Sequence, residues 1–324
     1  MRAVRVHQLT GPSGLEVDEV PEPKVGPGEV LLDVKAAGVN FPDLLLSYGK
    51  YQFKPEPPFV PGGEASGVVR EVGAGVTKVA PGDRVATTMI HGAFAEVIVV
   101  PDAMVAKIGD AVSFEAAAAT LLTYCTTLHA LVDRAALNAG DTLLVLGAAG
   151  GVGIAAVQLG KLLGARVIAA ASTDEKVAFC KEQGADEGIV YGREDLKERL
   201  KVLTSGQGAN VIYDPVGGAL AEPALRSIAW EGRYLVVGFA AGDIPKIPLN
   251  LVLLKGCQVV GVFWGSFAMR EPERNRAHAT QLFTWVQEGK LRPHVDAVLP
   301  FAQAGEALER LARRDVKGKI VLVP

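Results

Sequence analysis

The chain has 324 residues and a formal net charge of −3, from 33 Lys and Arg against 36 Asp and Glu. This length predicts about two domains, with a core large enough to need no disulfide or structural metal. Hydrophobic residues at 49% and charged residues at 21% exclude a mainly disordered chain, and the slightly acidic balance argues against a nucleic acid partner.

Cysteine usage and the N-terminus indicate a reducing compartment. Cys125, Cys180 and Cys257 form no CxxC pair, which disfavours a disulfide framework. The opening MRAVRVHQLTGPSG lacks the apolar run of a signal peptide. The uncharged stretch 142–160 is nearly long enough to span a membrane, but its glycines and the following Lys161 favour a buried strand, a turn and a helix. We expect a cytoplasmic protein with no membrane partner.

Residues 1–120 have the pattern of a β-rich domain. Apolar, β-branched runs alternate with Pro and Gly clusters such as Pro57-Pro58, which predicts a compact, barrel-like arrangement of short strands. The predicted strands are 3–7, 29–37, 65–72, 84–88 and 95–100.

Strands and helices alternate after an Ala- and Leu-rich helix predicted at 114–132 with Ser113 as its N-cap. This alternation predicts a parallel sheet covered by helices. Ser172 and Glu175 have the spacing of a capping box. The predicted strands are 142–146, 166–171, 188–191, 211–214, 232–238 and 258–263, and the predicted helices are 151–163, 174–183, 196–203 and 219–228.

The last part of the chain has two predicted helices, at 277–288 and 302–313, and a predicted strand at 319–323. We expect this part to fold back onto the first domain.

The most specific motif is AAGGVG at residues 148–153, which follows an apolar strand and opens a helix. It is a dinucleotide fingerprint with alanine at its first small position. Gly150, Gly151 and Val152 begin the helix, where amide groups can face a pyrophosphate and the glycines allow close approach. Gly153 allows the helix to pack on the strand. The motif predicts a Rossmann-type, doubly wound α/β domain that binds a dinucleotide. The alternative is a glycine packing turn.

The turn after the second strand of this domain bears on the choice of cofactor. It carries Ser172 and Thr173, with Lys176 nearby, where NAD sites usually have an Asp or Glu for the ribose hydroxyls. Hydroxyls and a cation suit a 2′-phosphate, so we predict NADPH. The alternative is that Ser172 only caps the helix, that Lys176 is a solvated lysine, and that both cofactors are accepted.

Several stretches together give the chain a family resemblance over essentially its whole length. It resembles the medium-chain dehydrogenase/reductase superfamily and, within it, the zinc-free NADPH:quinone oxidoreductase branch. The resemblance implies a GroES-like catalytic domain at 1–120, a Rossmann domain at 121–265, and a return of 266–324 to the catalytic domain. The matching stretches are AAGVNFPDLLLSYGKY from residue 36, PGGEASGVVREVG from 61, PGDRV from 81, AAGGVG from 148, YDPVGG from 213 and KGK from 317.

The chain departs from the zinc alcohol dehydrogenases at the metal-ligand positions. Ligands in those relatives fall where Asn40, Gly63 and, approximately, Leu122 stand here. Of these only Asn40 offers even a weak donor atom, whereas zinc needs three N, S or O ligands. We expect no zinc. Without a Lewis acid, quinones and α,β-unsaturated carbonyls are the favoured hydride acceptors, because conjugation spreads the arriving charge.

The resemblance also implies two residues near the nicotinamide and the substrate. Asn40 would bind a substrate carbonyl or the ribose, and Tyr51 would donate a hydrogen bond or a proton to a developing oxyanion. The alternatives are a turn residue and a packed loop aromatic. Asp43 and Glu64, in the same stretches, are interpreted chiefly as structural carboxylates.

Other cofactor contacts are implied along the second domain. Thr126 matches a threonine that contacts the nicotinamide region, and Tyr191 matches a tyrosine that helps to hold the 2′-phosphate. Gly238, Phe239 and Phe263 end predicted strands, and ligands of parallel sheets bind at that edge. The two phenylalanines could equally belong to the core.

The main hypothesis is therefore zinc-independent hydride transfer from NADPH to a quinone or enone. One alternative is reduction of an enoyl thioester of CoA, although no basic run near the first domain suits the CoA phosphates. Another is an NADPH-sensing or RNA-binding protein without turnover. The resemblance further implies a homodimer that pairs through an edge formed by 249–254 and 258–262.

Overall fold

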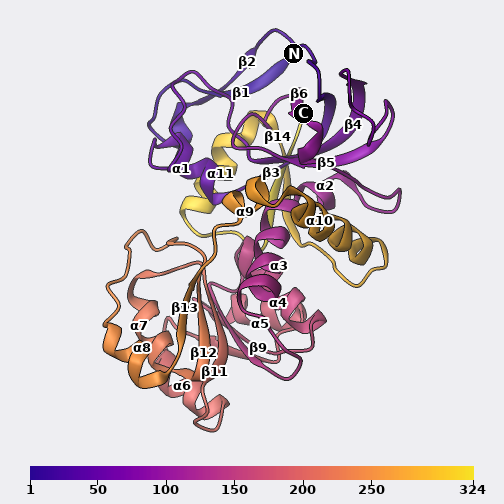
Figure 1. The fold of residues 1–324 in the computed structure, drawn as a ribbon. Coiled ribbons are helices and arrows are strands. Elements are labelled where there is room, and N and C mark those ends of the chain that lie inside the picture. The colour runs from indigo at the N-terminus through magenta and orange to yellow at the C-terminus, as the bar shows by residue number, and fades with distance from the viewer. The chain divides into compact units, whose positions relative to one another are not determined.

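The computed structural model describes residues 1–324, which form two compact units. The first unit comprises Met1–Leu122 and Glu271–Pro324, and the second comprises Thr123–Arg270. The C-terminal residues belong to the first unit because strand β15 (Lys319–Val323) pairs antiparallel with β3 (Glu29–Val39). Figure 1 shows this as yellow chain among the indigo and purple strands.

The first unit is built on a seven-stranded sheet in which β3 is the centre. The strand order is β14-β15-β3-β4-β5-β7, and β6 also pairs with β3. One large apolar cluster fills the interior, with β3 and α11 among its contributors. The other strands of this sheet are β4 (Glu64–Val72), β5 (Arg84–Thr88), β6 (Val97–Pro101), β7 (Val105–Lys107) and β14 (Val295–Pro300). A separate two-stranded sheet consists of β1 (Arg2–Val6) and β2 (Leu15–Glu19). The helices are α1 (Phe41–Ser47), α2 (Phe114–Ala118), α10 (Pro272–Gln287) and α11 (Ala304–Ala312).

The second unit is a six-stranded parallel sheet in the order β10-β9-β8-β11-β12-β13. Its strands are β8 (Thr142–Leu146), β9 (Arg166–Ala171), β10 (Glu187–Val190), β11 (Ala209–Asp214), β12 (Ile228–Val236) and β13 (Gln258–Gly261). Its helices are α3 (Thr126–Leu128), α4 (Gly151–Leu162), α5 (Asp174–Glu182), α6 (Leu196–Leu203), α7 (Ala221–Arg226), α8 (Leu249–Lys255) and α9 (Trp264–Arg270).

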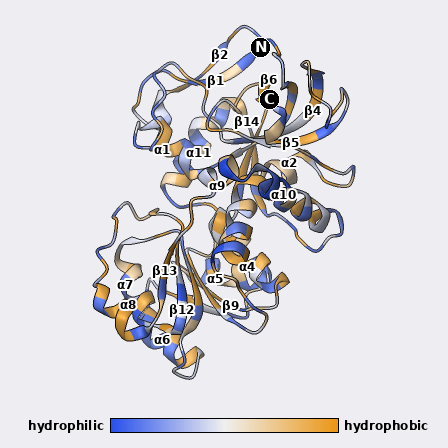
Figure 2. Cartoon of the chain, viewed as in Figure 1, coloured by the Kyte–Doolittle hydropathy of each residue, from blue (hydrophilic) through white to orange (hydrophobic).

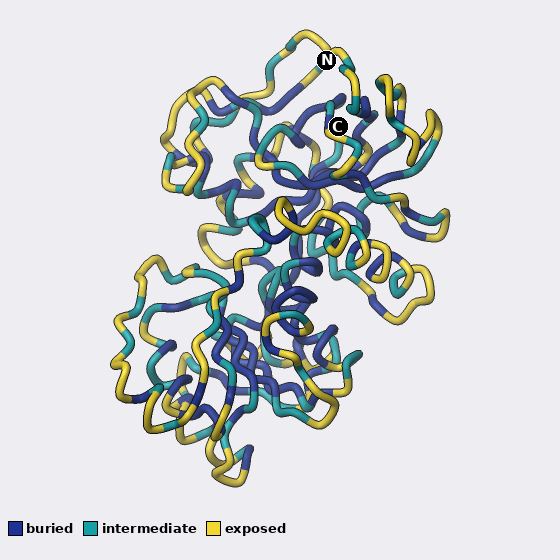
Figure 3. Tube along the Cα trace, in the orientation of Figure 1, coloured by how far each residue is buried: buried dark blue, intermediate teal, exposed yellow.

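Helices cover both faces of the parallel sheet. Leu143 faces α4, where it touches the helix at Gly160, whereas Leu144 belongs to the cluster formed with α6, α7 and α8. Alternate residues of each central strand are therefore buried on opposite faces, which explains the unbroken apolar runs in the sequence. In Figure 3 these strands are continuous dark blue.

The predicted strands are all present, with ends shifted by a few residues. Three strands were not predicted: β2, β7 and β14. They are short or half-exposed, so they lack a clear apolar alternation. Residues 249–254, which were expected at a sheet edge, form α8 instead.

Two helix predictions need correction. The helix expected at 114–132 is broken into α2, a π-helical segment Leu121–Cys125, the one-turn α3, and a second π-helical segment His129–Arg134. Ser113 does cap α2, since its side chain accepts the Ala116 amide.

The cap of α5 is Thr173 rather than Ser172. The Thr173 hydroxyl accepts the Lys176 amide at 3.3 Å. A cap must immediately precede the first helical residue, and Ser172 lies one position too early. None of the helices in residues 1–324 is long and apolar enough to cross a bilayer.

We predict that Gly153→Ala destabilises the second unit. A Cβ at Gly153 would lie 2.3 Å from the Gly147 carbonyl oxygen and 2.8 Å from Ala148 Cα. Both neighbours are backbone, so the helix must move, and such overpacking costs about 1–3 kcal/mol. The free energy of unfolding in urea, followed by circular dichroism, measures the loss.

Gly150→Ala is the matched control for this substitution. A Cβ there meets only the Gly147 oxygen, at 3.5 Å, so its unfolding free energy should stay close to that of the wild type. Equal stability of the two variants would contradict the packing role given to Gly153.

Candidate functional site

A buried polar cluster lies in the first unit where β3, β4, β15 and α1 meet. Asn40 joins β3 to α1, Glu64 begins β4, Lys319 begins β15, and Asp43 lies in the first turn of α1. The sheet brings them together because Gly38 pairs with Glu64, and Val39 with Ile320. All four side chains are at most 4% exposed. Charged groups buried to this extent need partners.

The Lys319 ammonium uses all of its donors inside this cluster. It donates to Glu64 Oε1 at 2.5 Å, to Asn40 Oδ1 at 2.6 Å and to the Val39 carbonyl at 3.0 Å. Since an ammonium group has three N–H bonds, no donor is left over. Glu64 Oε2 accepts the Leu122 amide at 2.8 Å, so this carboxylate is also well satisfied.

The Asn40 side chain is equally occupied. Its amide nitrogen donates to Glu64 Oε1 at 3.0 Å and to the Gly38 carbonyl at 3.1 Å, and its oxygen accepts from Lys319. Both N–H bonds are therefore in use within the protein. The geometry gives Asn40 a clear role in holding Lys319 and Glu64.

Asp43 is the one carboxyl of the cluster that is only half satisfied. Its Oδ2 accepts the Asn40 amide at 2.8 Å, but Oδ1 is buried with no hydrogen-bond partner. Burial raises the pKa of Asp43 to about 7. The backbone amides of Asn40 and Gly62 and the charge of Lys319 oppose the rise, and the charge of Glu64 adds to it. Asp43 is therefore a group that changes charge near neutral pH.

Tyr51 lies within electrostatic range of Asp43. It is half-buried and packs against the small apolar cluster of Val6, Leu46 and Phe59. Burial raises the pKa of the Tyr51 phenol, and the charge of Asp43 raises it further. The phenol therefore keeps its proton at neutral pH.

The positions of the zinc ligands of related dehydrogenases are adjacent here but offer almost no donor atoms. A Cβ at Gly63 would lie 3.3 Å from Leu122 Cδ1, and neither residue can bind a metal. Asn40 could offer an oxygen, which is already taken by Lys319. This donor set does not fit zinc, which needs three protein ligands.

One other group of potential metal ligands is on the surface of the β1–β2 hairpin. His7, Glu16 and Asp18 lie close enough to share an ion. Asp18, however, is bonded to His7 at 2.8 Å and to Arg5 at 3.3 Å, and the Arg5 cation opposes metal binding. We assign no metal to this group.

The glycine turn of the second unit is closely packed at Gly147 and open at Gly150. Gly147 makes the turn itself, with φ of +59°, and a Cβ there would lie 2.7 Å from Val216. The fingerprint predicted from residues 148–153 has an alanine at its first small position and leaves out Gly147, although this glycine directly follows the apolar strand. No side chain caps α4, and a Cβ at Gly150 would meet only one atom, at 3.5 Å. An uncapped helix start with room beside it suits a pyrophosphate at Gly151 and Val152.

The predicted 2′-phosphate residues gather at the ends of β9 and β10. Parallel pairing places Val190 beside Ala171, and the Tyr191 amide donates to the Ala171 carbonyl at 3.1 Å. Tyr191 therefore neighbours the turn that carries Ser172, Thr173 and Lys176.

Sequence reasoning missed one cation at this edge, Arg193. Its guanidinium pairs with Asp174 at 2.5 Å, and both side chains are exposed. Arg193 lies shortly after the end of β10. This closeness to the end of a strand was the signal in the sequence that could have identified it. It places a second basic side chain beside the turn, paired with Asp174.

The other predicted cofactor residues also lie at the carboxyl edge of this sheet. Gly238 and Phe239 follow β12, and the Gly238 amide donates to the Asp214 carbonyl. Phe239 and Phe263 are 38% and 59% exposed, so neither belongs to the core. Thr126 precedes Thr127, whose hydroxyl lies 3.4 Å from the Val152 carbonyl beside the glycine turn.

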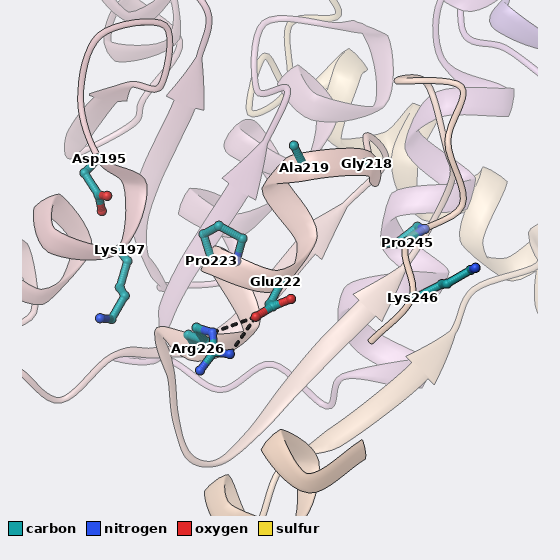
Figure 4. A pocket seen from close by; sticks show the side chains of 9 residues that line it. All are labelled: Asp195, Lys197, Gly218, Ala219, Glu222, Pro223, Arg226, Pro245 and Lys246. Atoms are coloured by element: carbon teal, nitrogen blue, oxygen red, sulfur yellow. Dashed lines mark hydrogen bonds and ion pairs between the residues drawn. The ribbon is translucent and has the colours of Figure 1, made fainter. Parts of the chain in front are cut away.

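An open pocket of about 420 Å³ lies in the second unit near the starts of α6 and α7 (Figure 4). Glu222 and Arg226 form an ion pair there, and Lys197 and Lys246 are exposed. None of the predicted cofactor residues lines this pocket, and its charges are solvated or paired, so we assign no ligand to it.

Comparison with known proteins identifies the family of the chain. A family model described as "Alcohol dehydrogenase GroES-like domain" matches residues 26–110, and one described as "Zinc-binding dehydrogenase" matches residues 151–284. The "Quinone oxidoreductase-like protein 2 homolog" of Nematostella vectensis is 40% identical, covering 99% of this chain and 88% of its own. The chain belongs to the quinone oxidoreductase-like family of medium-chain oxidoreductases. The expected fold class, a Rossmann-type sheet with a GroES-like domain, is thereby confirmed.

Two bacterial quinone oxidoreductases extend the comparison. The enzyme of Pseudomonas aeruginosa is 35% identical over 97% of each chain. The structure of Escherichia coli quinone oxidoreductase complexed with NADPH superposes with a TM-score of 0.94 at 30% identity and covers 100% of both chains. This member of the quinone oxidoreductase-like family therefore shares its fold with that enzyme over the full length of both chains.

We predict that Lys319→Met strongly destabilises the first unit. It leaves the Glu64 carboxylate buried and unpaired, which costs about 3–5 kcal/mol. Adding Glu64→Gln to Lys319→Met should recover a large part of the loss. Urea unfolding of the single and double variants measures both values.

Lys161→Met is the control, because its ion pair with Asp186 is more than one-third exposed. It should cost at most about 1 kcal/mol. If Lys319→Met lowers the free energy of unfolding no more than Lys161→Met does, the buried pair is not a major stabilising contact.

Proposed function

We propose that this protein is a zinc-independent reductase that uses NADPH to reduce a quinone or an α,β-unsaturated carbonyl. The observation that carries the proposal is that Asn40, Gly63 and Leu122 cannot supply the three ligands that zinc needs. The same chain has the glycine turn of a dinucleotide site at the start of α4. The NADPH complex of the Escherichia coli relative supports the choice of cofactor.

The second unit would hold the cofactor at three places. The amides at the start of α4, at Gly150, Gly151 and Val152, would bind the pyrophosphate. The 2′-phosphate would meet the hydroxyls and cations at the ends of β9 and β10: Ser172, Thr173, Lys176, Tyr191 and Arg193. The nicotinamide end would meet Thr126, Gly238, Phe239 and Phe263. When bound, the reduced cofactor supplies the hydride.

The first unit would orient the acceptor and support the charge that forms on it. Tyr51 would donate a hydrogen bond to the developing oxyanion, since its phenol is protonated at neutral pH. Asn40 would contact a substrate carbonyl or the ribose only by giving up its 3.1 Å bond to the Gly38 carbonyl. Its main contribution would be to hold Lys319 and Glu64 in place.

We also propose a homodimer that forms along β13, the last strand of the parallel sheet. One edge of β13 has no partner strand in the chain, and such edges pair readily with a second copy. Large apolar side chains are exposed nearby: Trp230, Leu249, Leu253, Leu254 and Val259. Figure 2 shows the hydrophobic colour along α8.

Light scattering tests the dimer. The wild type should show twice the chain mass of 34.0 kDa at micromolar concentration. Leu253→Lys together with Val259→Lys should give a monomer. Val202→Lys changes another exposed apolar residue, on α6 and away from β13, and should stay dimeric. A monomeric wild type would rule the dimer out.

Oxidation of NADPH and NADH by metal-chelated protein, with an ortho-quinone as acceptor, tests the activity and the cofactor together. Turnover should be faster with NADPH. Lys176→Ala and Arg193→Ala should each raise the KM for NADPH by about tenfold or more, the loss of one charged hydrogen bond, and leave that for NADH unchanged.

Lys181→Ala is the matched control, because Lys181 lies on the same helix, is exposed, and is not among the proposed contacts. Equal kinetics with NADPH and NADH in the wild type would exclude the phosphate site. Tight NADPH binding without quinone turnover would instead favour an enoyl substrate or a sensing role.

A further inference from the structure

The two turns that follow β9 and β10 touch each other through their backbones. A Cβ at Gly192 would lie 2.6 Å from the Ser172 carbonyl oxygen, so this approach requires a glycine. Just before it, the Tyr191 amide donates to the Ala171 carbonyl at 3.1 Å. The side chains that leave the two turns therefore share one small area at the carboxyl edge of the parallel sheet.

One ion pair joins the two turns. Arg193 Nη2, from the turn after β10, lies 2.5 Å from Oδ1 of Asp174, the first residue of α5. The neighbouring acid Glu194 is engaged elsewhere, since its Oε2 accepts the Val190 amide at 2.6 Å and its Oε1 lies 3.4 Å from Arg199 Nε. Asp174 is therefore the carboxylate that balances the charge of Arg193.

The fold does not depend on this pair. The Arg193 side chain is 63% exposed and the Asp174 side chain is 70% exposed, and ion pairs exposed to this extent contribute little to stability. A guanidinium group has five N–H donors, of which the pair with Asp174 uses one. A second anion can therefore share Arg193 with Asp174 or replace Asp174 beside it.

The charges around the two turns do not favour a strongly anionic ligand. The basic side chains Lys176 and Arg193 are matched in number by the acidic side chains Asp174 and Glu175. A phosphate monoester carries between one and two negative charges at neutral pH. Whether it shares Arg193 or displaces Asp174, it meets the repulsion of the Asp174 carboxylate, whereas a 2′-hydroxyl has no charge to be repelled.

We propose that Asp174 is a specificity-determining residue, which competes with the 2′-phosphate for Arg193 and so limits the preference for NADPH over NADH. The inference rests on the proposed function, because it takes the ends of β9 and β10 as the 2′-phosphate site. Asp174 acts through Arg193, so it is a positioning residue and takes no part in hydride transfer.

Calorimetric titration of the full chain with 2′,5′-ADP and with 5′-AMP tests the competition, since the two nucleotides differ only in the 2′-phosphate. Asp174→Asn removes the charge and keeps the size of the side chain. It should lower the Kd for 2′,5′-ADP by about fivefold, the value of an exposed ion pair, and leave that for 5′-AMP unchanged. The gain should shrink at high ionic strength.

Two further variants show whether the effect belongs to this ion pair. Glu182→Gln removes an exposed acid at the other end of α5 and should leave both Kd values unchanged. In the Arg193→Ala background, Asp174→Asn should have little effect, because the group for which it competes is absent. In the quinone assay, Asp174→Asn should raise the ratio of kcat/KM for NADPH to that for NADH by about fivefold.

The outcomes separate this inference from the proposed function. An unchanged or raised Kd for 2′,5′-ADP in Asp174→Asn, or an equal gain with and without Arg193, overturns the competition alone. A wild type that binds 2′,5′-ADP no better than 5′-AMP overturns the proposed NADPH site and this inference with it. The expected binding results without quinone turnover overturn the proposed reaction and leave the role of Asp174 supported.

Discussion

The buried ion pair between Lys319 and Glu64 is the contact on which the first unit depends. It joins the first residue of the last strand to the first residue of β4, with Asn40 between them at the junction of β3 and α1. The charges are not exposed to solvent, so their mutual attraction and their hydrogen bonds must replace hydration. This requirement fixes the C-terminal strand against β3 and the start of α1.

The same pair sets the character of its neighbour. Because the one buried cation is fully used by Glu64, Asn40 and a carbonyl, Asp43 cannot form an ion pair at contact distance. Its charge is therefore governed by burial, and a proton becomes an alternative to a counter-ion. A structural ion pair and a titratable acid are in this way two consequences of one arrangement.

The fold of the second unit depends on close approach of the backbone at two glycines, rather than on a buried ion pair. Gly147 turns with a positive φ, and Gly153 allows α4 to approach the turn, so two glycines serve the fold. Gly150 is not required by internal packing, and α4 has no side-chain cap. The part of the motif that the fold leaves open is the part that a phosphate would use.

The sequence by itself determined the parallel sheet, the glycine turn and most strand positions, because these follow from local apolar runs and from residues close together in the chain. It could not find the break of the helix at 114–132, the cap at Thr173 or the ion pair of Arg193 with Asp174. Each of these depends on the exact position of one residue or on the end of a neighbouring strand. Only the tertiary structure decided the states of Asp43 and Asn40. Asn40 binds Glu64 and Lys319, which are 24 and 279 positions away, and the count of donors and acceptors in a buried cluster is a property of the assembled fold.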